Sequence, residues 1–470
     1  MELRFYRVVA RRNLFLAVEF RASVTGQQNL FSKRRRWQIS PKQFVPSKKR
    51  KSYDDVDISG LLNARIGREA RREGKIDMTL LNDPRPISAD SHAIESSEVF
   101  EGLAERFGDD APRIVHSEGN GDWITIPNQP KRARNVAIMC LAGTRLDYEV
   151  PLPRAHASKP SAGSMDDPEI QAYFKGGYAA MRPGLKDGSR RPDDQDIDGI
   201  SAEILYPGWF PMFGLPNIDL LVALQRNYNN WMYSQQVASK GRLVGLAALP
   251  VQQPERAHEE LARIIKMGMK GIVIPSNAPR GRRYSDDVYE PMWALAEEAG
   301  LPIAFHVACM SHAPDWLKAS STRDPIVQYA GSSALIHDTL VELMVRGVCE
   351  KHPNLKFVLA EFNAGWVAHW LDKVHQGWAR EYAKDSSSKP PMDVLEIWKR
   401  QFYATIEDDT AALRTREMIG EDTLLWGSDY PHTDSTWPCS AQVLDEMFEG
   451  FGAETRDKIT RTNVAKLYSL

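Results

Sequence analysis

The sequence predicts a single (β/α)8 barrel, in which eight parallel strands close into a ring inside a layer of helices. Two observations lead to this fold class. Between residues 87 and 427, eight apolar runs of strand length alternate with longer stretches, most of which have helical periodicity. Runs that are apolar on both faces are typical of parallel strands covered by helices, and eight is the number of strands that closes such a barrel.

The predicted strands are short runs rich in aliphatic residues. In chain order they span residues 87–92, 202–206, 243–249, 271–274, 302–306, 356–361, 401–406 and 423–427. An open, doubly wound sheet is the alternative architecture. We do not favour it, because no glycine-rich phosphate-binding loop follows the first strand.

The predicted helices lie between most of these strands, which lets consecutive strands run in the same direction. The clearest helix spans residues 254–267, where Ala257, Leu261 and Ile264 fall on one face. The others span residues 220–239, 287–299, 340–351, 366–382, 410–419, 440–449 and 454–467.

Two connections are longer than an ordinary strand-to-helix loop. Residues 107–192, rich in Pro and Gly, form an insertion after the first strand, and residues 308–333 form a second long loop after the fifth. In a barrel, both would emerge at the C-terminal ends of the strands. The insertion is therefore expected to cover that face.

Residues 1–85 are predicted to be a poorly ordered, basic N-terminal arm without a strand, outside a barrel of residues 86–470. Residues 1–51 contain 14 Lys and Arg against two acidic residues, whereas the remainder holds 46 basic and 60 acidic residues. The acidic body makes nucleic-acid binding an unfavoured function. A short helix over residues 57–72 is the one element expected in the arm. A tail, a targeting segment and a start codon placed too far upstream are all compatible with it.

The composition excludes several classes of protein. No run of about 18 apolar residues occurs, so no membrane span is expected. The four cysteines lie far apart and form no CxxC pair, which favours reduced thiols in a cytoplasmic protein.

Residues that can bind a metal ion stand at the ends of four predicted strands. Asp90 and His92 end the first strand, and their spacing of two places both side chains on one face. His306 ends the fifth strand, Glu361 the sixth, and Asp429 follows the eighth. Because the active sites of barrels form at the C-terminal strand ends, we expect these side chains to converge. Mixed nitrogen and oxygen ligands suit one divalent ion, Zn²⁺ first, with Mn²⁺ or Fe²⁺ as alternatives.

Each of these residues also has an ordinary structural explanation when taken alone. Aspartate is common as a helix N-cap, and a single histidine at a strand end is often a hydrogen-bonded core residue. The joint occurrence at four strand ends is what predicts a site. Three more residues, Glu95, His432 and His312, are expected to contact the substrate or to support the ligands.

Six stretches between Pro86 and Leu470 resemble the amidohydrolase superfamily, in particular the amidohydrolase-related group that includes aminocarboxymuconate semialdehyde decarboxylase. The most specific is Trp426-Gly-Ser-Asp-Tyr-Pro-His432. The others are Ser88-Ala-Asp-Ser-His-Ala-Ile-Glu95, Gly199-Ile-Ser-Ala-Glu-Ile-Leu-Tyr-Pro207, Gly268-Met-Lys-Gly-Ile-Val-Ile274, Leu301-Pro-Ile-Ala-Phe-His306 and Gly347-Val-Cys-Glu-Lys-His-Pro-Asn-Leu-Lys-Phe357.

The resemblance implies metal ligands at Asp90, His92, His306 and Asp429. Two positions depart from the family pattern, because Asp90 and Glu361 each stand where the family has a histidine. The second departure weakens the expectation of a decarboxylase, since the family's histidine there contacts substrate and handles protons. Lys270 stands at the wrong end of its strand for a bridging ligand, so a mononuclear site is expected.

The first expectation for function is a metal-dependent hydrolase. In it, Asp429 takes a proton from a metal-activated water, and Glu361 positions the water or a small carboxylate, amide or lactone substrate. A non-oxidative decarboxylase is the main alternative, and a dinuclear iron oxygenase is a rarer outcome in the family. A non-catalytic barrel subunit is the alternative of another class. The sequence itself does not indicate an oligomeric state; the resemblance implies a homodimer, because dimers are common among related proteins.

Overall fold

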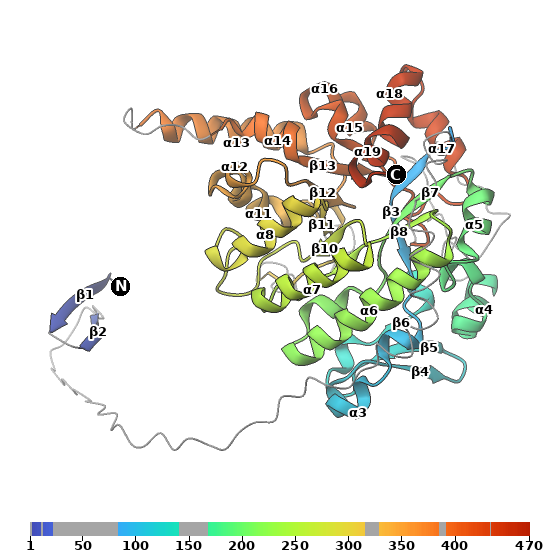
Figure 1. Cartoon of the computed structure of the whole chain (residues 1–470), viewed down its shortest axis with the longest axis horizontal. Helices are drawn as coiled ribbons and strands as arrows, with labels where there is room; N and C mark the ends of the chain where they lie inside the picture. Colours follow the sequence, from blue (N-terminus) through green and yellow to red (C-terminus); the bar gives the residue numbers. More distant parts are fainter. Residues whose placement is uncertain are drawn as a thin grey trace, which may run out of the picture. The chain divides into compact units, whose positions relative to one another are not determined.

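Eight parallel strands form a closed barrel in the computed structural model, which describes residues 2–10, 13–21, 83–140, 168–314, 329–384, 392–432 and 434–470 (Figure 1). In chain order the strands are β3 (Ile87–Ala93), β7 (Ala202–Pro207), β8 (Leu243–Gly245) with β9 (Ala247–Ala248), β10 (Ile272–Ile274), β11 (Ile303–His306), β12 (Phe357–Ala360), β13 (Phe402–Ile406) and β14 (Leu424–Trp426). β8 and β9 are two halves of one strand, interrupted at Leu246. All eight predicted strands are confirmed.

Neighbours in the barrel follow the order of the chain. β3 pairs with β7 and β7 with β8, while β9 to β14 form a continuous parallel sheet. Between the last and first strands lies a junction that we call the seam, made by residues 88–92 and 427–430. It contains an isolated parallel bridge between Ser91 and Tyr430. Two main-chain hydrogen bonds cross it, from His92 N to Tyr430 O and from Asp429 N to Asp90 O, both 2.8 Å.

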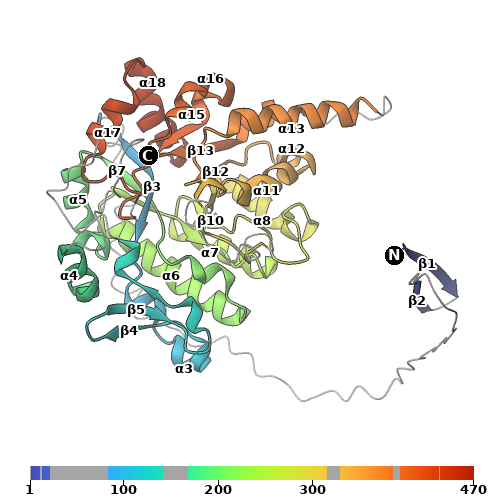
Figure 2. The same cartoon turned by 180° about the vertical axis from the view of Figure 1, so that it is seen from behind.

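Helices surround the strands, as the periodicity predicted (Figures 1 and 2). They include α6 (Ile218–Ala238), α7 (Pro254–Met267), α8 (Glu290–Ala299), α11 (Ala334–Val345), α13 (Val367–Tyr382), α14 (Val394–Gln401), α17 (Ser440–Met447) and α19 (Asn463–Tyr468). In α7, the predicted apolar face of Ala257, Leu261 and Ile264 is buried. α14 was not predicted, because its eight residues are too few to show a clear period.

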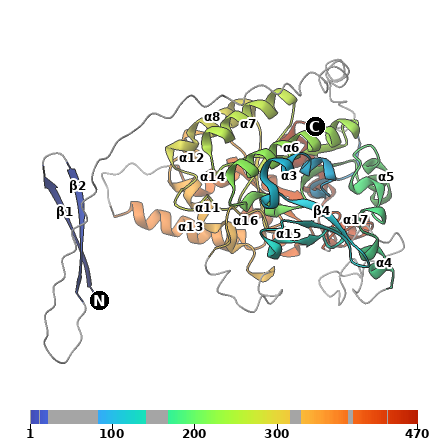
Figure 3. The same cartoon turned by 90° about the horizontal axis from the view of Figure 1, so that it is seen from below.

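The insertion after β3 has secondary structure of its own. α3 (Leu103–Phe107) leads into it, and it contains a small antiparallel sheet of β4 (Arg113–Ser117), β5 (Gly121–Thr125) and β6 (Arg134–Asn135), followed by α4 (Pro168–Gly176). Figure 3 shows these elements on the side of α5 (Arg191–Asp198), across the barrel from α13. α5 leads the chain from the insertion into β7.

A separate unit at the N-terminus contains an antiparallel ribbon of β1 (Glu2–Ala10) and β2 (Asn13–Arg21). The prediction of no strand before residue 86 was therefore wrong here. Leu14 to Val18 form a continuous apolar run, and periodicity alone does not identify a run this short as a strand. The helix predicted over residues 57–72 lies outside the described residues. Among the described helices, none combines the length and apolar character needed to cross a membrane.

Candidate metal centre and active site

The four metal ligands expected from the sequence meet at the C-terminal end of the barrel. Asp90 and His92 come from β3, His306 is the last residue of β11, and Asp429 follows β14; all four are fully buried. His92 Nε2 lies 3.2 Å from Asp429 Oδ1 and 3.7 Å from Asp90 Oδ1. His306 Nε2 lies 3.4 Å from the same Asp90 oxygen. Asp90, His92 and His306 therefore form one cluster of donor atoms, and Asp429 adjoins this cluster through His92.

Several of these atoms have no hydrogen-bond partner among the described residues, although they are buried. They include Asp90 Oδ1, His92 Nε2 and His306 Nε2. Buried polar atoms are almost always paired, so such a group of unpaired atoms indicates a missing ligand. The donor atoms of Asp90, His92 and His306 also lie within 4.8 Å of one another. This donor set fits a single divalent cation.

The orientation of His92 is set by the turn after β7. Its Nδ1 lies 2.9 Å from the carbonyl oxygen of Pro207, so Nδ1–H donates there and Nε2 turns its lone pair inward. Glu95 holds the same turn, because its Oε1 accepts hydrogen bonds from the backbone N–H groups of Gly208 and Trp209, both 3.0 Å. Burial raises the pKa of Glu95 to about 7. Glu95 thus lies behind His92 and is buried, not solvated.

Asp90 is held by β13 and by the seam. Thr405 Oγ1 donates to Asp90 Oδ2 at 3.3 Å and accepts from the backbone N–H of Glu361 at 2.9 Å. Gly427 packs directly on Asp90, since a Cβ at this glycine would lie 2.5 Å from Asp90 Cβ. Our sequence reasoning missed Thr405, although it is an isolated polar residue in an otherwise apolar strand.

Glu361 lies beside the candidate ligands His306 and Asp429, at the outer edge of the site. Its Oε2 is 3.3 Å from His306 Nε2, and its side chain is 21% exposed, whereas that of His306 is fully buried. Glu361 and Asp429 both have a left-handed backbone, with φ of 59° and 53°. This conformation is strained for residues with a side chain and tends to occur at functional sites. Burial, with the nearby charge of Asp429, raises the pKa of Glu361 well above its usual range.

His432 joins the centre from the loop after β14. Its ring stacks on His92 with 3.8 Å between the centroids, and its Nδ1 lies 3.0 Å from Asp429 Oδ1. Burial opposes the charged form of Asp429, but His432 and His92 outweigh burial and hold its pKa well below the usual range. Burial lowers the pKa of His92 to about 4 and that of His306 to about 3, so both rings are neutral, as metal ligands must be.

His312 lies in the loop that follows the candidate ligand His306. It follows β11 in the long loop, where its Nδ1 lies 2.8 Å from Ser311 Oγ and its carbonyl oxygen accepts from Asn277 Nδ2 at 2.8 Å. Neither of the two groups of metal-binding side chains found in the described residues includes it. Of the three supporting residues predicted, His432 belongs to a cluster with His92, Glu361 and Asp429, and Glu95 holds the turn behind His92. A contact of His312 with the substrate stays a prediction.

Two buried residues at the mouth were not predicted. Glu407 follows β13 and is 2% exposed; burial, with the charges of Asp429 and Asp434, raises its pKa well above the usual range. It occupies the end of the seventh strand, a position that the inspection of strand ends should have included. Tyr206, on β7, places its ring 5.0 Å from that of His306. The sequence gives little indication that Tyr206 belongs to the site, because a tyrosine in a strand is usually a packing residue.

Comparison with known proteins agrees with the resemblance inferred from the motifs. The family described as amidohydrolase matches residues 199–470. Gamma-resorcylate decarboxylase from Rhizobium sp. (strain MTP-10005) is 23% identical over 307 residues, which cover 58% of this chain and 85% of the relative. 2-Amino-3-carboxymuconate-6-semialdehyde decarboxylase from Dictyostelium discoideum is 25% identical over 288 residues, covering 59% and 74%.

Solved structures show the same fold. An amidohydrolase from Mycobacterium avium subsp. paratuberculosis K-10 superposes with a TM-score of 0.65 at 22% identity, covering 82% of this chain and 99% of that one. A dihydroxybenzoic acid decarboxylase from Polaromonas sp. JS666, with bound manganese and the inhibitor 2-nitroresorcinol, gives a TM-score of 0.52 at 21% identity, covering 60% and 85%.

These matches reorder the two reactions expected from the sequence. Hydrolysis was placed first, but the two curated relatives described above are decarboxylases. Glu361, which stands where the family has a histidine, remains the feature of this chain that departs from a decarboxylase. The sequence favours zinc, and the Polaromonas structure holds manganese; a single divalent metal ion is consistent with both.

Proposed function

The chain belongs to the amidohydrolase family, and from this premise we propose that it is a metal-dependent, non-oxidative decarboxylase of a small aromatic or unsaturated carboxylate. The observation that carries the proposal is the group of buried, unpaired donor atoms of Asp90, His92 and His306 at the mouth of the barrel. The activities named for the two curated relatives support the choice of reaction.

We assign Asp90, His92, His306 and Asp429 as the ligands of one divalent ion. Two carboxylates make this donor set harder than a set of histidines alone, which favours Mn²⁺ alongside Zn²⁺, with Fe²⁺ as a further alternative. The ion supplies Lewis-acid chemistry, because it polarises the oxygen atoms of the substrate. Its identity is tested by metal analysis of the purified protein, and a metal content well below one per chain would argue for a non-catalytic barrel.

The protein's own residues supply the proton that the reaction needs. When the bond between the ring carbon and the carboxyl group breaks and CO₂ leaves, a proton has to reach that carbon. Asp429 is assigned to pass it to the carbon. Asp429 itself is ionised, so the proton comes from the protonated His432, whose Nδ1 lies 3.0 Å from Asp429 Oδ1. The side chain of His432 is 18% exposed, so His432 can return a proton to Asp429 from solvent. Glu361, at the outer edge, is assigned to hold the substrate's polar groups.

Hydrolysis is the second candidate, and one observation favours it. Glu361, not an imidazole, follows β12 at the position where the family's decarboxylases are expected to carry a proton-handling histidine. Under this alternative, Asp429 accepts a proton from the attacking water and returns it to the leaving group. The substrate would then be an amide or a lactone.

Product analysis separates the two reactions. The purified protein, loaded with Mn²⁺ or Zn²⁺, is incubated in ¹⁸O-labelled water with a panel of hydroxybenzoates, amides and lactones. Release of CO₂ without ¹⁸O in the organic product supports the decarboxylase. Incorporation of ¹⁸O without CO₂ would replace it with the hydrolase. The same assay is run on Asp429→Asn, which removes the proposed proton-transfer group. Asp445→Asn makes the same change at an exposed side chain that pairs with Arg456, and it serves as the control.

A homodimer remains part of the proposal, and light scattering tests it.

A further inference from the structure

α5 buries a polar face, which is the reverse of an ordinary surface helix. Arg191, Asp194, Gln195 and Asp198 are 1–3% exposed, whereas Ile197 on the same helix is 45% exposed. Their spacing places the four polar residues on one side. A surface helix normally turns its apolar residues to the core and its charges to water. The buried face of α5 is therefore built for particular polar contacts with the barrel.

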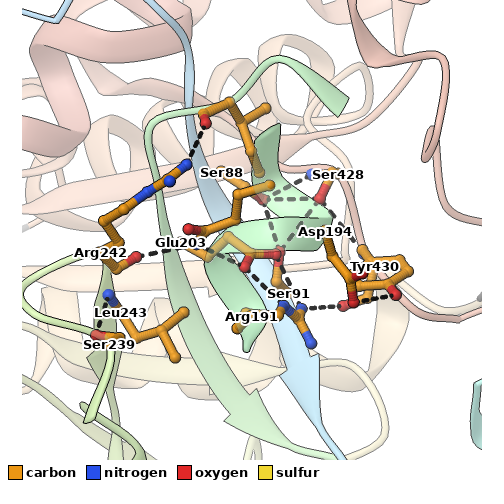
Figure 4. Close-up of polar contacts among 12 residues, drawn as sticks. Ser88, Ser91, Arg191, Asp194, Glu203, Ser239, Arg242, Leu243, Ser428 and Tyr430 are labelled. Atoms are coloured by element: carbon orange, nitrogen blue, oxygen red, sulfur yellow. Dashed lines mark hydrogen bonds and ion pairs between the residues drawn. The ribbon is translucent and has the colours of Figure 1, made fainter. Parts of the chain in front are cut away.

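Arg191 is the centre of these contacts (Figure 4). Its guanidinium makes a bidentate pair with Glu203 on β7, with Nε–Oε2 and Nη2–Oε1 distances of 2.7 and 2.9 Å. The same group donates from Nη1 to the carbonyl oxygen of His92 at 3.1 Å and from Nη2 to that of Tyr430 at 3.2 Å. These two carbonyl groups stand on opposite sides of the seam. One rigid side chain thus joins β3, β7 and the chain after β14.

The rest of the polar face holds the segment that follows Asp429. Asp194 accepts a hydrogen bond from the hydroxyl group of Tyr430 at 2.9 Å, and its carbonyl oxygen accepts from the indole of Trp437 at 3.1 Å. Asp198 accepts from the backbone N–H of Ser440 at 2.9 Å. α5 therefore fastens the chain at three points between residues 430 and 440.

The seam depends on such side chains because its backbone pairing is short. A single bridge is assigned between β3 and the chain after β14, and hydroxyl groups of Ser88, Ser91 and Ser428 fill the space beside it (Figure 4). The candidate ligands Asp90 and His92 lie on one side of this junction and Asp429 on the other. Their separation consequently depends on how the seam is held.

We propose that Arg191 is a positioning residue for the metal centre, which sets the spacing of the ligands across the seam through the carbonyl groups of His92 and Tyr430. A buried ion pair adds little net stability compared with a well-packed apolar pair, so stability alone does not account for Arg191 and Glu203. The guanidinium offers five donors in a fixed plane, which suits one carboxylate and two carbonyl groups at once. Residues that hold metal ligands in place tune metal affinity without touching the metal.

Arg242 provides a matched control. It also donates to two carbonyl groups, those of Ser201 and Ile200 at 2.9 and 3.0 Å, and it pairs with Asp196 at 2.9 Å. These partners precede β7, at the opposite end of that strand from the metal centre. Arg191→Lys keeps the positive charge but removes the planar guanidinium with its several donors. Arg242→Lys makes the same change away from the candidate ligands. Arg191→Met with Glu203→Met removes the pair without leaving a buried charge.

The test is the Mn²⁺ dissociation constant of the wild-type protein and these variants, together with hydrogen exchange of the metal-free proteins. Arg191→Lys and the double variant are expected to bind Mn²⁺ about 10-fold to 100-fold more weakly, while Arg242→Lys binds like the wild type. The amides of His92 and Asp429, which donate across the seam, are expected to exchange faster only when Arg191 is changed.

The inference rests on the metal centre of the proposed function, but the two fail in different ways. A wild-type protein that binds neither Mn²⁺ nor Zn²⁺ overturns the proposed metal centre. Tight binding by the wild type and equally tight binding by the Arg191 variants overturns the inference alone. If neither Arg191 variant folds while Arg242→Lys does, Arg191 serves the fold as a whole and the positioning role is wrong.

Discussion

Replacing Gly427 by alanine is expected to push Asp90 away from the metal centre. A Cβ at residue 427 would lie 2.5 Å from Asp90 Cβ and 3.0 Å from Asp90 N. Carbon atoms in favourable contact are about 3.5–4.0 Å apart, so the two chains have to separate by about 1 Å. Both chains belong to the seam, where Asp429 N donates to Asp90 O at 2.8 Å. The change therefore acts on two ligands at once.

The size of this displacement determines the expected effect. A bond between a divalent metal and a carboxylate oxygen is about 2.0–2.2 Å long, so a shift of about 1 Å removes most of the contribution of Asp90. Overpacking of a buried site also costs about 1–3 kcal/mol of stability. We expect Gly427→Ala to weaken metal binding by more than about 10-fold and to lower the unfolding temperature of the metal-free protein.

Gly377→Ala is the matched control. Gly377 lies within α13, and an added Cβ there meets no atom within 4 Å. Alanine is favoured over glycine in a helix by about 0.8–1.0 kcal/mol, so this variant should unfold at a slightly higher temperature and bind metal normally. Isothermal titration with Mn²⁺ and thermal unfolding followed by circular dichroism provide both measurements. If Gly427→Ala bound Mn²⁺ like the wild type, the geometric argument for the seam would be wrong.

Three further predictions concern the proton donor, the metal and a buried carboxyl group. Asp429→Asn should lower turnover by about 10²-fold or more without changing the circular dichroism spectrum, and an unchanged rate would remove Asp429 from the proton-transfer role. Removal of the metal by a chelator should abolish turnover and lower the unfolding temperature. When the free metal is present at 100 times its dissociation constant, binding stabilises the folded state by about 2.7 kcal/mol, and the chelator removes this stabilisation. Burial raises the pKa of Asp198 to about 7, so the folded state favours the protonated form. The stability that this group contributes is present below its unfolded pKa of about 3.9 and is lost as the pH rises towards 7. The unfolding temperature of Asp198→Asn, relative to the wild type, should therefore rise between pH 5 and pH 8, and a constant difference would contradict this.

The barrel and most of its helices could be predicted because their signals are local. Each strand is an apolar run without a polar face, which is typical of a strand buried on both sides. In α7, the apolar residues recur at helical spacing, and these residues are the buried ones. The gathering of the candidate ligands could be predicted for a related reason, since residues at the C-terminal ends of parallel strands gather at one end of a barrel. The same rule would have found Glu407 if it had been applied to the seventh strand.

Contacts between residues that are far apart in the sequence could not be predicted. Thr405 was missed because its partner, Asp90, is 315 residues away. The partner of His312, Ser311, could not be predicted either, because a position in a loop does not reveal where the side chain points. The acidic and basic residues of α5 suggest an exposed helix, and their burial depends on contacts with Tyr430 and Ser440.

The sequence by itself determined the barrel and the ligand-bearing strand ends, because apolar burial and strand position are properties of short segments. Only the tertiary structure decided which nitrogen of His92 faces inward, that Glu95 holds the turn behind it, and that Arg191 joins the two sides of the seam. Each of these contacts links segments far apart in the chain. The closing of the barrel is what places them within hydrogen-bonding distance.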